Sequence, residues 1–324
     1  MTEAPRVSII ISTFNRRVEI LKRLFDSIRK QDFKNYEILL VDQSTDNQIR
    51  DANKHLCAEH KVYYADICDR QPSLTVSRNF GIENTSGDII IFLDDDTELI
   101  RNDYLDKVLE AFGICPDAIG ISGLNYPPPN TGRLNKFLLF LKRFFLHLMF
   151  AFNPFNTQEI TGYFHNVDFY RVPKDITEVD WLYGSNMAYK RNLFEKIHFD
   201  ENLKRYSLRE DVDFSFRAKK FGEIYVTPFA RVHHFEEKTG RINFKKRTLM
   251  ELSYWTYLYY KNIKKPSDFV AKLNSFLIFL RYLRKAICSL SKENTDAVVY
   301  AKHIFTENFD KIKKLNLSSV NEEI

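Results

Sequence analysis

Hydrophobic runs and polar breaks alternate along the first third of the chain with the spacing of strands and helices. The runs of four to six mainly apolar and β-branched residues have the composition of strands, and the run at 88–93 has that of a strand buried on both faces. They lie at 7–12, 36–41, 62–65, 88–93 and 118–122. Between them, apolar positions with helical spacing predict helices, first at Leu21, Leu24, Phe25 and Ile28, then over 75–84 and 104–112. This alternation predicts a doubly wound α/β sheet that is mostly parallel.

The pattern changes after residue 123. Prolines interrupt it at 127–129, and residues 136–152 are then almost wholly apolar and aromatic. On a helix, Lys136, Arg143 and His147 would form one narrow polar stripe on a broad apolar surface. Such a segment is too apolar for a surface helix and too short and charged to span a bilayer. A core helix, an interfacial membrane helix and a groove for a lipid substrate all remain open.

The second half returns to mixed structure and then becomes helical. Residues 181–190 have a strand pattern interrupted at 184–186, 208–221 predict a helix closed by Gly222, and 223–227 predict a strand. Beyond His234 the chain is mostly helical, with aromatic, leucine and basic residues concentrated at 249–260 and 269–290.

Composition excludes several classes of protein. A net charge of +5 is too small to indicate nucleic-acid binding, and no nucleic-acid-binding signature is present. Four widely spaced cysteines without a C-x-x-C pair predict a reducing compartment, no disulfide framework and no zinc site. The polar start at 1–6 is not a secretory leader, and no apolar run is long enough to span a membrane. We therefore expect a cytoplasmic location.

Three consecutive aspartates follow the strand at 88–93 and are the most informative polar feature. Their mutual repulsion is relieved when a cation binds, and carboxylate oxygens suit Mg²⁺ or Mn²⁺. On extended backbone Asp94 and Asp96 share one face, while Asp95 points to the other and is expected to tolerate change best. A simpler alternative is an acidic loop in which Asp96 and Thr97 cap a helix that begins near Asn102.

Other strand ends also carry polar side chains. Small hydroxyls at Ser12 and Thr13 leave room for a ligand, on which Phe14 could stack, and Asp42 could accept from the N–H of a base. The simpler explanations are a helix cap at Asn15 and local turn bonds after Asp42. An arginine at position 78 could neutralise phosphates or could be a solvated side chain.

The second half supplies a further acidic pair and a histidine. Glu210 and Asp211 are predicted to begin a helix, and the helix dipole by itself explains acidic residues at that end. The same dipole lowers the pKa of such a carboxylate, which would then be ionised at neutral pH and able to accept a proton. His234 could be a third metal ligand, although a lone histidine is more often structural or exposed. Lys238 and Arg241 could contact phosphate oxygens.

Taken in order, these segments resemble glycosyltransferase family 2, which has the GT-A fold. The resemblance covers about residues 6–241 and departs from many members at Gln43, where they carry a second aspartate. In the first half, the first strand and turn lie at 7–16, the base-binding strand end at 41–46 and the approach to a D-x-D motif at 77–96. In the second half, the segment before the acceptor site lies at 184–191, an E-D helix at 209–217 and a P-x-A-x-V-x-H stretch at 228–234.

The resemblance implies inverting transfer of a sugar from a nucleotide diphosphate donor, expected to be a UDP- or dTDP-sugar, to a hydroxyl of a glycan or lipid-linked acceptor. Asp211 would be the general base, with Glu210 and Asp213 as the less favoured choices. Asp94, Asp96 and His234 would hold Mg²⁺ or Mn²⁺. The donor would contact Ser12, Thr13, Phe14, Arg16, Asp42, Gln43, Arg78, Asp94 and Asp95, with Lys238 and Arg241 at its phosphates. The acceptor would contact Trp181, Gly184, Ser185 and Asn186.

We expect a GT-A domain over 1–241 and a helical C-terminal extension over 242–324. Within the first, 1–123 would bind the nucleotide, 124–180 would be an aromatic insertion and 181–241 would be the acceptor and catalytic half. Segment 136–152 and the extension suggest peripheral contact with the inner face of the cytoplasmic membrane, or a homodimer interface. Two rival classes remain, a non-catalytic sugar- or nucleotide-binding relative and a metal-dependent nucleotidyltransferase, although 12–16 lack the glycines of a phosphate loop.

Overall fold

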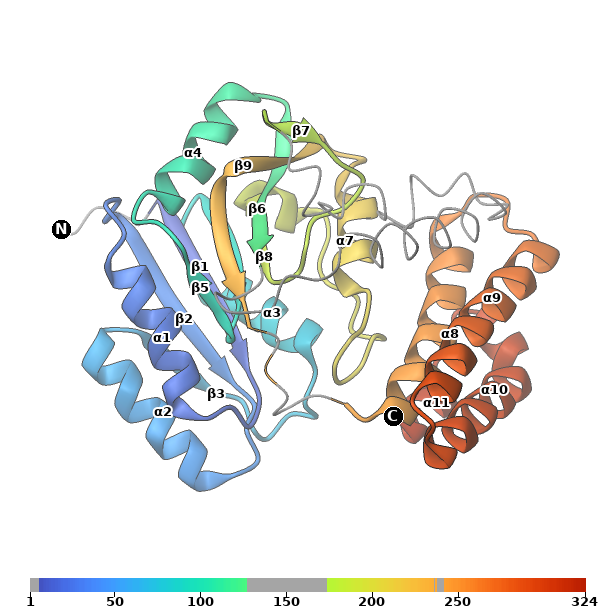
Figure 1. The fold of residues 1–324 in the computed structure, drawn as a ribbon. Coiled ribbons are helices and arrows are strands. Elements are labelled where there is room, and N and C mark those ends of the chain that lie inside the picture. Colours follow the sequence, from blue (N-terminus) through green and yellow to red (C-terminus); the bar gives the residue numbers. More distant parts are fainter. Residues whose placement is uncertain (1–5, 127–173, 236, 238–241) are drawn as a thin grey trace. The chain divides into compact units, whose positions relative to one another are not determined.

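The computed structural model describes residues 6–126, 174–235, 237 and 242–324 (Figure 1). The chain divides into two compact units. The described part of the first unit runs from residue 6 to 237, with the gaps given above, and the described part of the second is 242–324.

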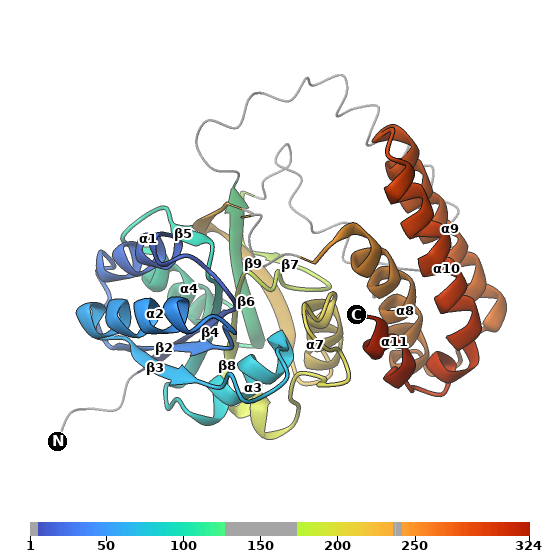
Figure 2. The same ribbon diagram turned by 90° about the horizontal axis from the view of Figure 1, so that it is seen from below.

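A nine-stranded mixed sheet forms the centre of the first unit, counted over the described residues (Figures 1 and 2). Strands β3, β2, β1 and β4 lie side by side and parallel; β8 runs antiparallel to β4 and β6, and β9 runs parallel to β6. Strands β5 and β7 pair antiparallel with β9. The strands are β1 (Val7–Thr13), β2 (Tyr36–Asp42), β3 (Tyr63–Asp66), β4 (Ile89–Asp94), β5 (Thr97–Leu99), β6 (Ala118–Tyr126), β7 (Thr177–Glu178), β8 (Asn186–Lys190) and β9 (Glu223–His234).

Helices cover both faces of this sheet. They are α1 (Val18–Arg29), α2 (Asn47–His60), α3 (Leu74–Glu83), α4 (Tyr104–Ile114), the 3₁₀ helix η1 (Arg191–Glu195) and α7 (Glu210–Ala218). In β4, Ile91 and Leu93 pack into the core shared with α1 and α4, whereas Ile90 and Phe92 pack into the core shared with α7. The prediction that the strand leading to the three aspartates is buried on both faces is therefore confirmed.

Several elements differ from the sequence predictions. Helix α2 and the short strand β5 were not predicted, and β9 continues to His234 instead of ending at residue 227. Helix α7 is shorter at both ends than the predicted 208–221. Aspartate 96 does not cap a helix, since β5 follows it directly and α4 begins at Tyr104.

The described part of the second unit, 242–324, is built from α-helices. Helices α8 (Phe244–Asn262), α9 (Asp268–Cys288) and α10 (Lys292–Lys313) pack around one another, and the short α11 (Ser318–Glu323) packs on α8 and α10. The hydroxyls of Thr256 and Ser275 meet at 3.0 Å between α8 and α9. Among the described helices, none combines the length and the apolar character needed to cross a bilayer. The predicted aromatic helix over 136–152 lies outside the described residues.

Candidate active site

Three side chains predicted as metal ligands converge at one edge of the sheet. Asp94 ends β4, Asp96 precedes β5, and His234 ends β9, where it lies opposite Thr97 in the β5–β9 register. His234 Nε2 lies 3.1 Å from Asp96 Oδ1 and 3.8 Å from Asp94 Oδ2. One ligand atom from each residue lies within 4.8 Å of the others. The pairing of β5 with β9 therefore brings together residues about 140 positions apart in the chain.

The chemistry of this donor set fits a hard or borderline divalent cation. Two carboxylates and an imidazole suit Mn²⁺, and the carboxylates also suit Mg²⁺. Asp96 is held in place because its Oδ2 accepts from the backbone N–H of Glu237 at 2.9 Å. Burial alone would raise the pKa of Asp96, but the hydrogen bond and charge of His234 and the charge of Arg16 outweigh it and lower the pKa below its usual value. The side chains of Asp94 and His234 are 33% and 23% exposed, so a ligand can reach them.

Asp95 points away from this triad, as the alternation predicted, but it is not an idle residue. Its carboxylate accepts from Thr13 Oγ1 at 2.8 Å and forms an ion pair with Arg16, whose Nη2 is 2.7 Å from Oδ1. Burial raises the pKa of Asp95 to about 6, although Arg16 opposes the shift. These buried bonds contradict the expectation that Asp95 tolerates change best. They also direct Arg16 toward the acidic motif, where Nη2 lies 3.8 Å from Asp96 Oδ2.

The loop after β1 is hydrogen-bonded to the loop after β2 through Asn15. Asn15 does not cap α1, because the helix begins at Val18 and its cap position is Arg17. Its side-chain oxygen instead accepts from the backbone N–H of Thr45 at 2.9 Å, and its backbone has a positive φ of 49°. Ser12, which lies opposite Asp94 in the β1–β4 register, has a buried hydroxyl without a hydrogen-bond partner in the described structure. This oxygen is therefore a buried polar atom beside the triad whose hydrogen bond is not made within the described structure.

The side chains of Asp42 and Gln43, which were expected to hydrogen-bond the base of the donor, already hydrogen-bond other groups of the protein. Asp42 is fully buried and accepts from Ser44 N, Asn53 Nδ2 and Tyr64 Oη at 2.8, 2.8 and 3.3 Å. The Gln43 oxygen accepts from Ser73 N at 2.9 Å and from Ser77 Oγ at 2.7 Å, and the side chain is buried. The predicted hydrogen bonds to a base are therefore not supported, because these groups already hold their own surroundings together.

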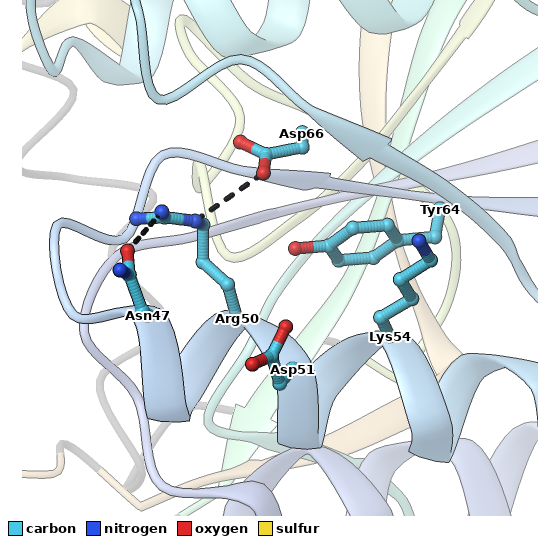
Figure 3. A pocket seen from close by; sticks show the side chains of 6 residues that line it. All are labelled: Asn47, Arg50, Asp51, Lys54, Tyr64 and Asp66. Atoms are coloured by element: carbon cyan, nitrogen blue, oxygen red, sulfur yellow. Dashed lines mark hydrogen bonds and ion pairs between the residues drawn. The ribbon is translucent and has the colours of Figure 1, made fainter.

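A surface pocket of about 450 Å³ lies between α2 and β3, beside the end of β2 (Figure 3). Arg50 pairs with Asp66 Oδ2 at 3.2 Å and donates to Asn47 within the pocket. The Tyr64 hydroxyl connects the pocket wall to the buried Asp42. The lining residues are Asn47, Arg50, Asp51, Lys54, Tyr64 and Asp66. The sequence did not predict this pocket, since four of its six lining residues come from α2, a helix that was not predicted.

The polar side chains of the motif Ser77-Arg78-Asn79 on α3 are buried and bond to neighbouring elements; they do not face solvent. Arg78 Nη1 donates to Glu210 Oε1 at 2.5 Å, and Nη2 donates to the Gly184 carbonyl at 2.8 Å. The same guanidinium is 3.6 Å from Asp94 Oδ1 and stacks against two phenylalanine rings. Asn79 bonds the backbone of Phe199 in both directions. A contact of Arg78 with donor phosphates stays a prediction, and in this structure the guanidinium is bound by groups of the protein.

The N-terminus of α7 presents one carboxylate differently from its neighbours. Asp211 is half-buried, and it accepts from the backbone N–H of Gly184 at 3.1 Å and of Val212 at 2.8 Å. Burial raises its pKa above the usual value for an aspartate. Glu210 is buried against Arg78, and Asp213 pairs with Arg217 Nη2 at 2.7 Å. Of the three acids, Asp211 is therefore the one that remains accessible for a proton transfer.

The loop before α7 is conformationally strained. Arg205, Ser207 and Arg209 all have positive φ values, 56°, 47° and 76°, although none is glycine. Each such residue costs of order 1–3 kcal/mol and persists only where the surroundings impose it. The backbone of this loop is tied to the start of α3, because Leu74 N donates to the Arg205 carbonyl at 2.9 Å. The strained backbone of this loop is therefore held against α3, which fixes the direction in which α7 begins with Glu210 and Asp211.

Residues expected to contact an acceptor have largely structural surroundings. Asn186 is buried, and its side-chain oxygen accepts from Gly123 N at 2.8 Å. Ser185 accepts from Asn125 at 2.8 Å. Trp181 is also buried, but its indole N–H has no hydrogen-bond partner in the described structure. Lys238 and Arg241, expected at the donor phosphates, lie outside the described residues.

Comparisons with known proteins agree with this architecture. The glycosyl transferase family 2 model matches residues 8–197, more than half of the chain. The GalNAc(5)-diNAcBac-PP-undecaprenol beta-1,3-glucosyltransferase of Campylobacter jejuni is 32% identical over 97 residues, which are 30% of this chain and 31% of that protein. Glycosyltransferase AglE of Haloferax volcanii is 33% identical over 135 residues, which are 40% and 42% of the two chains. The matched segment is less than half of each relative.

Solved structures share the fold across almost the whole chain. The mannosyltransferase PcManGT from Pyrobaculum calidifontis, in complex with GDP-Man and Mn²⁺, has a TM-score of 0.55 at 13% identity and covers 99% of this chain and 87% of its own. Residues 1–349 of S. aureus TarS, in complex with UDP-GlcNAc, have a TM-score of 0.55 at 14% identity, with 97% and 84% covered. This chain has the GT-A fold and belongs to glycosyl transferase family 2.

Proposed function

We propose that this protein is an inverting glycosyltransferase that moves a sugar from a nucleotide diphosphate donor to a hydroxyl of a glycan or lipid-linked acceptor. The observation that supports it most is the convergence of Asp94, Asp96 and His234 at the sheet edge, with Asp211 joined to the same region through Gly184 and Arg78. His234 and Asp211 lie beyond residue 197, where the family match ends, so their roles rest on this geometry.

Asp211 is the proposed general base. It would take the proton from the acceptor hydroxyl while the hydroxyl oxygen bonds to the anomeric carbon and the bond to the donor diphosphate breaks. The N–H groups of Gly184 and Val212 orient the carboxylate and favour its ionised form, which must exist before the proton is taken. Attack from the face opposite the leaving group gives inversion.

The triad is the proposed holder of Mg²⁺ or Mn²⁺, whose positive charge would stabilise the diphosphate as it leaves. The exposed part of Asp94 is available to the donor at the same edge. UDP- and dTDP-sugars remain the first donors to test. GDP-mannose belongs in the panel as well, because Asp42 and Gln43 are occupied and the similar mannosyltransferase binds it.

Calorimetric titration with nucleotide sugars, with and without Mn²⁺, tests this assignment. We expect one donor to bind in a Mn²⁺-dependent way, and Asp96→Ala to lose the Mn²⁺-dependent part of the affinity. Asp296→Ala, at an exposed position of α10 in the second unit, is the matched control and should bind normally. Unchanged affinity in Asp96→Ala would remove Asp96 from the metal site, and release of pyrophosphate in place of nucleoside diphosphate would reject the reaction class.

A further inference from the structure

Helix α9 carries four large apolar side chains that are exposed, whereas its Ile278, Phe279 and Leu283 pack against the core of the second unit. Phe269, Phe276, Leu280 and Ile287 are 72%, 50%, 39% and 58% exposed. Their spacing of seven, four and seven residues puts them on one face of the helix. We call these four residues the α9 outer face.

The opposite side of α9 is made mainly of small residues and provides the packing. Ala271, Ser275 and Ala286 are buried there together with Tyr282. Ser275 bonds Thr256 of α8, and Tyr282 donates to Glu251 of α8 at 3.3 Å. The bundle is therefore held together through this inner side, and the α9 outer face contributes little to its core.

Basic side chains flank the outer face. Lys272 and Arg284 are exposed and lie about 60° to either side of its centre line on a helix with 100° per residue. Together with Arg281 and Lys285 they give α9 four basic residues against the single acidic Asp268. Lysine and arginine beside an apolar stripe can keep their charges at the lipid headgroups while their stems lie along the hydrocarbon.

Charge is also divided unequally along the chain. Residues 242–324 carry 15 Lys and Arg against eight Asp and Glu, whereas the rest of the chain carries 33 against 35. The net positive charge of the protein therefore lies wholly in the second unit. A second copy of the chain docked on α9 would bring the same four basic residues against their equivalents, so charge complementarity favours an anionic partner.

We propose that the α9 outer face binds the interfacial region of an anionic phospholipid bilayer, with the helix axis parallel to the membrane plane. At 21 residues α9 is roughly 30 Å long and offers one continuous apolar strip. An amphipathic helix of this kind lies at the boundary between headgroups and acyl chains. This inference goes beyond the proposed reaction and does not depend on it.

Flotation of the full chain with vesicles tests the proposal. Wild type should float with vesicles of equal parts phosphatidylglycerol and phosphatidylcholine, and at least about tenfold less with phosphatidylcholine alone. The double variant Phe276→Ser/Leu280→Ser should lower the partition coefficient at least about tenfold. Lys272→Gln/Arg284→Gln should lower it about fivefold per charge, with a smaller difference at high salt.

Matched controls separate this effect from a general loss of surface hydrophobicity. Tyr63→Ser/Ile114→Ser removes two side chains that are 66% and 60% exposed in the first unit, and it should float like wild type. A fluorophore on Cys288, which is exposed at the end of α9, should shift to shorter wavelengths with anionic vesicles in a Cys68→Ser background. This second measurement leaves α9 without substitutions, so it does not depend on how the variants fold.

Three results would overturn the proposal. The first is equal flotation with neutral and anionic vesicles, and the second is no flotation with either. The third is a concentration-dependent dimer in sedimentation that Phe276→Ser/Leu280→Ser converts to monomer without any change in vesicle binding, since the α9 outer face would then serve a second copy of the chain.

Discussion

At position 184 a side chain of any size would collide with the buried carboxylate of Glu210. A Cβ there would lie 2.8 Å from Glu210 Oε1, 3.2 Å from Arg78 Nη2 and 3.4 Å from Asp211 Cβ. The glycine therefore allows the turn before β8 to approach the start of α7 closely enough for its N–H to reach Asp211. One missing side chain sets the distance between two elements of the site.

We predict that Gly184→Ala displaces the start of α7 and lowers turnover at least about tenfold, because a shift of the base by even one ångström can cost about a hundredfold in rate. Gly113→Ala is the matched control. It adds a Cβ near the end of α4, where no atom lies within 4 Å, and should stabilise the protein by up to about 1 kcal/mol. Steady-state kinetics and urea denaturation of both variants measure the difference, and normal turnover in Gly184→Ala would contradict it.

We predict that Asp211→Asn retains donor affinity but loses at least about 10²-fold in turnover, since the amide cannot accept the proton. Wild-type turnover should fall as pH decreases, because the base must be ionised. The raised pKa of Asp211 moves this acid limb upward from that of an ordinary aspartate. A pH profile with a limb at or below the usual aspartate pKa would argue for another base.

The sequence predicted the triad more successfully than the residues around it. Asp94 and Asp96 could be found because strand alternation and the end of a strand at the sheet edge are visible in the sequence. His234 was identified only through the resemblance of 228–234 to a family motif, since its strand was expected to end at residue 227. The partners of Asp42, Arg78 and Asn186 could not, because a polar residue type does not reveal whether its side chain is buried. Sequence alone could therefore not separate a ligand-binding arginine from one that holds a helix in place.

At the scale of elements, Arg78 joins three of them. From α3 it reaches Glu210 on α7, Asp94 at the end of β4 and the carbonyl of Gly184. Burial raises the pKa of Glu210 to about 8, so the arginine charge opposes a substantial desolvation cost. Arg78 thereby fixes the distance between Asp94 and α7, the helix that carries the proposed base.

We predict that Arg78→Met lowers the free energy of unfolding by about 3–5 kcal/mol, because it leaves Glu210 buried without its partner. The double variant Arg78→Met/Glu210→Gln should regain part of this loss, and urea denaturation of the complete double-mutant cycle measures the coupling. Additive losses would mean that the two side chains do not act as a pair. Arg78→Lys should keep the charge but not the forked bond, so it should lie between wild type and Arg78→Met.

Helices with few buried apolar residues escaped prediction for a physical reason. In α2 the buried side chains are Asn53, Leu56, Cys57 and His60, so only two of the four are apolar and no stripe can be seen in the sequence. Asp46 begins this helix by accepting from the N–H groups of the first turn, a signal that a turn explains equally well. In α9 the apolar spacing identified a helix, but only the structure showed which side packs.

At the scale of the whole molecule, each unit contains one of the two tryptophans. Trp181 is buried in the first unit and Trp255 in the second. Because each unit has its own buried core, we predict that they unfold separately. Urea titration of Trp181→Phe and Trp255→Phe, followed by fluorescence, should give different midpoints for the remaining tryptophan. Coincident midpoints, matched by circular dichroism of wild type, would show one cooperative structure.

The distribution of the triad along the chain also has a consequence for the protein during its synthesis. A ribosome adds about 5–20 residues per second, so His234 is made roughly 7–28 seconds after Asp94. During this interval β4 and its aspartates exist without β9, which is the strand that brings the histidine to them. A nascent chain stalled before residue 223 should therefore show no manganese-dependent protection from protease. The same chain extended past 242 and clear of the exit tunnel should show it, because we expect the last strand of the sheet to complete the proposed metal site.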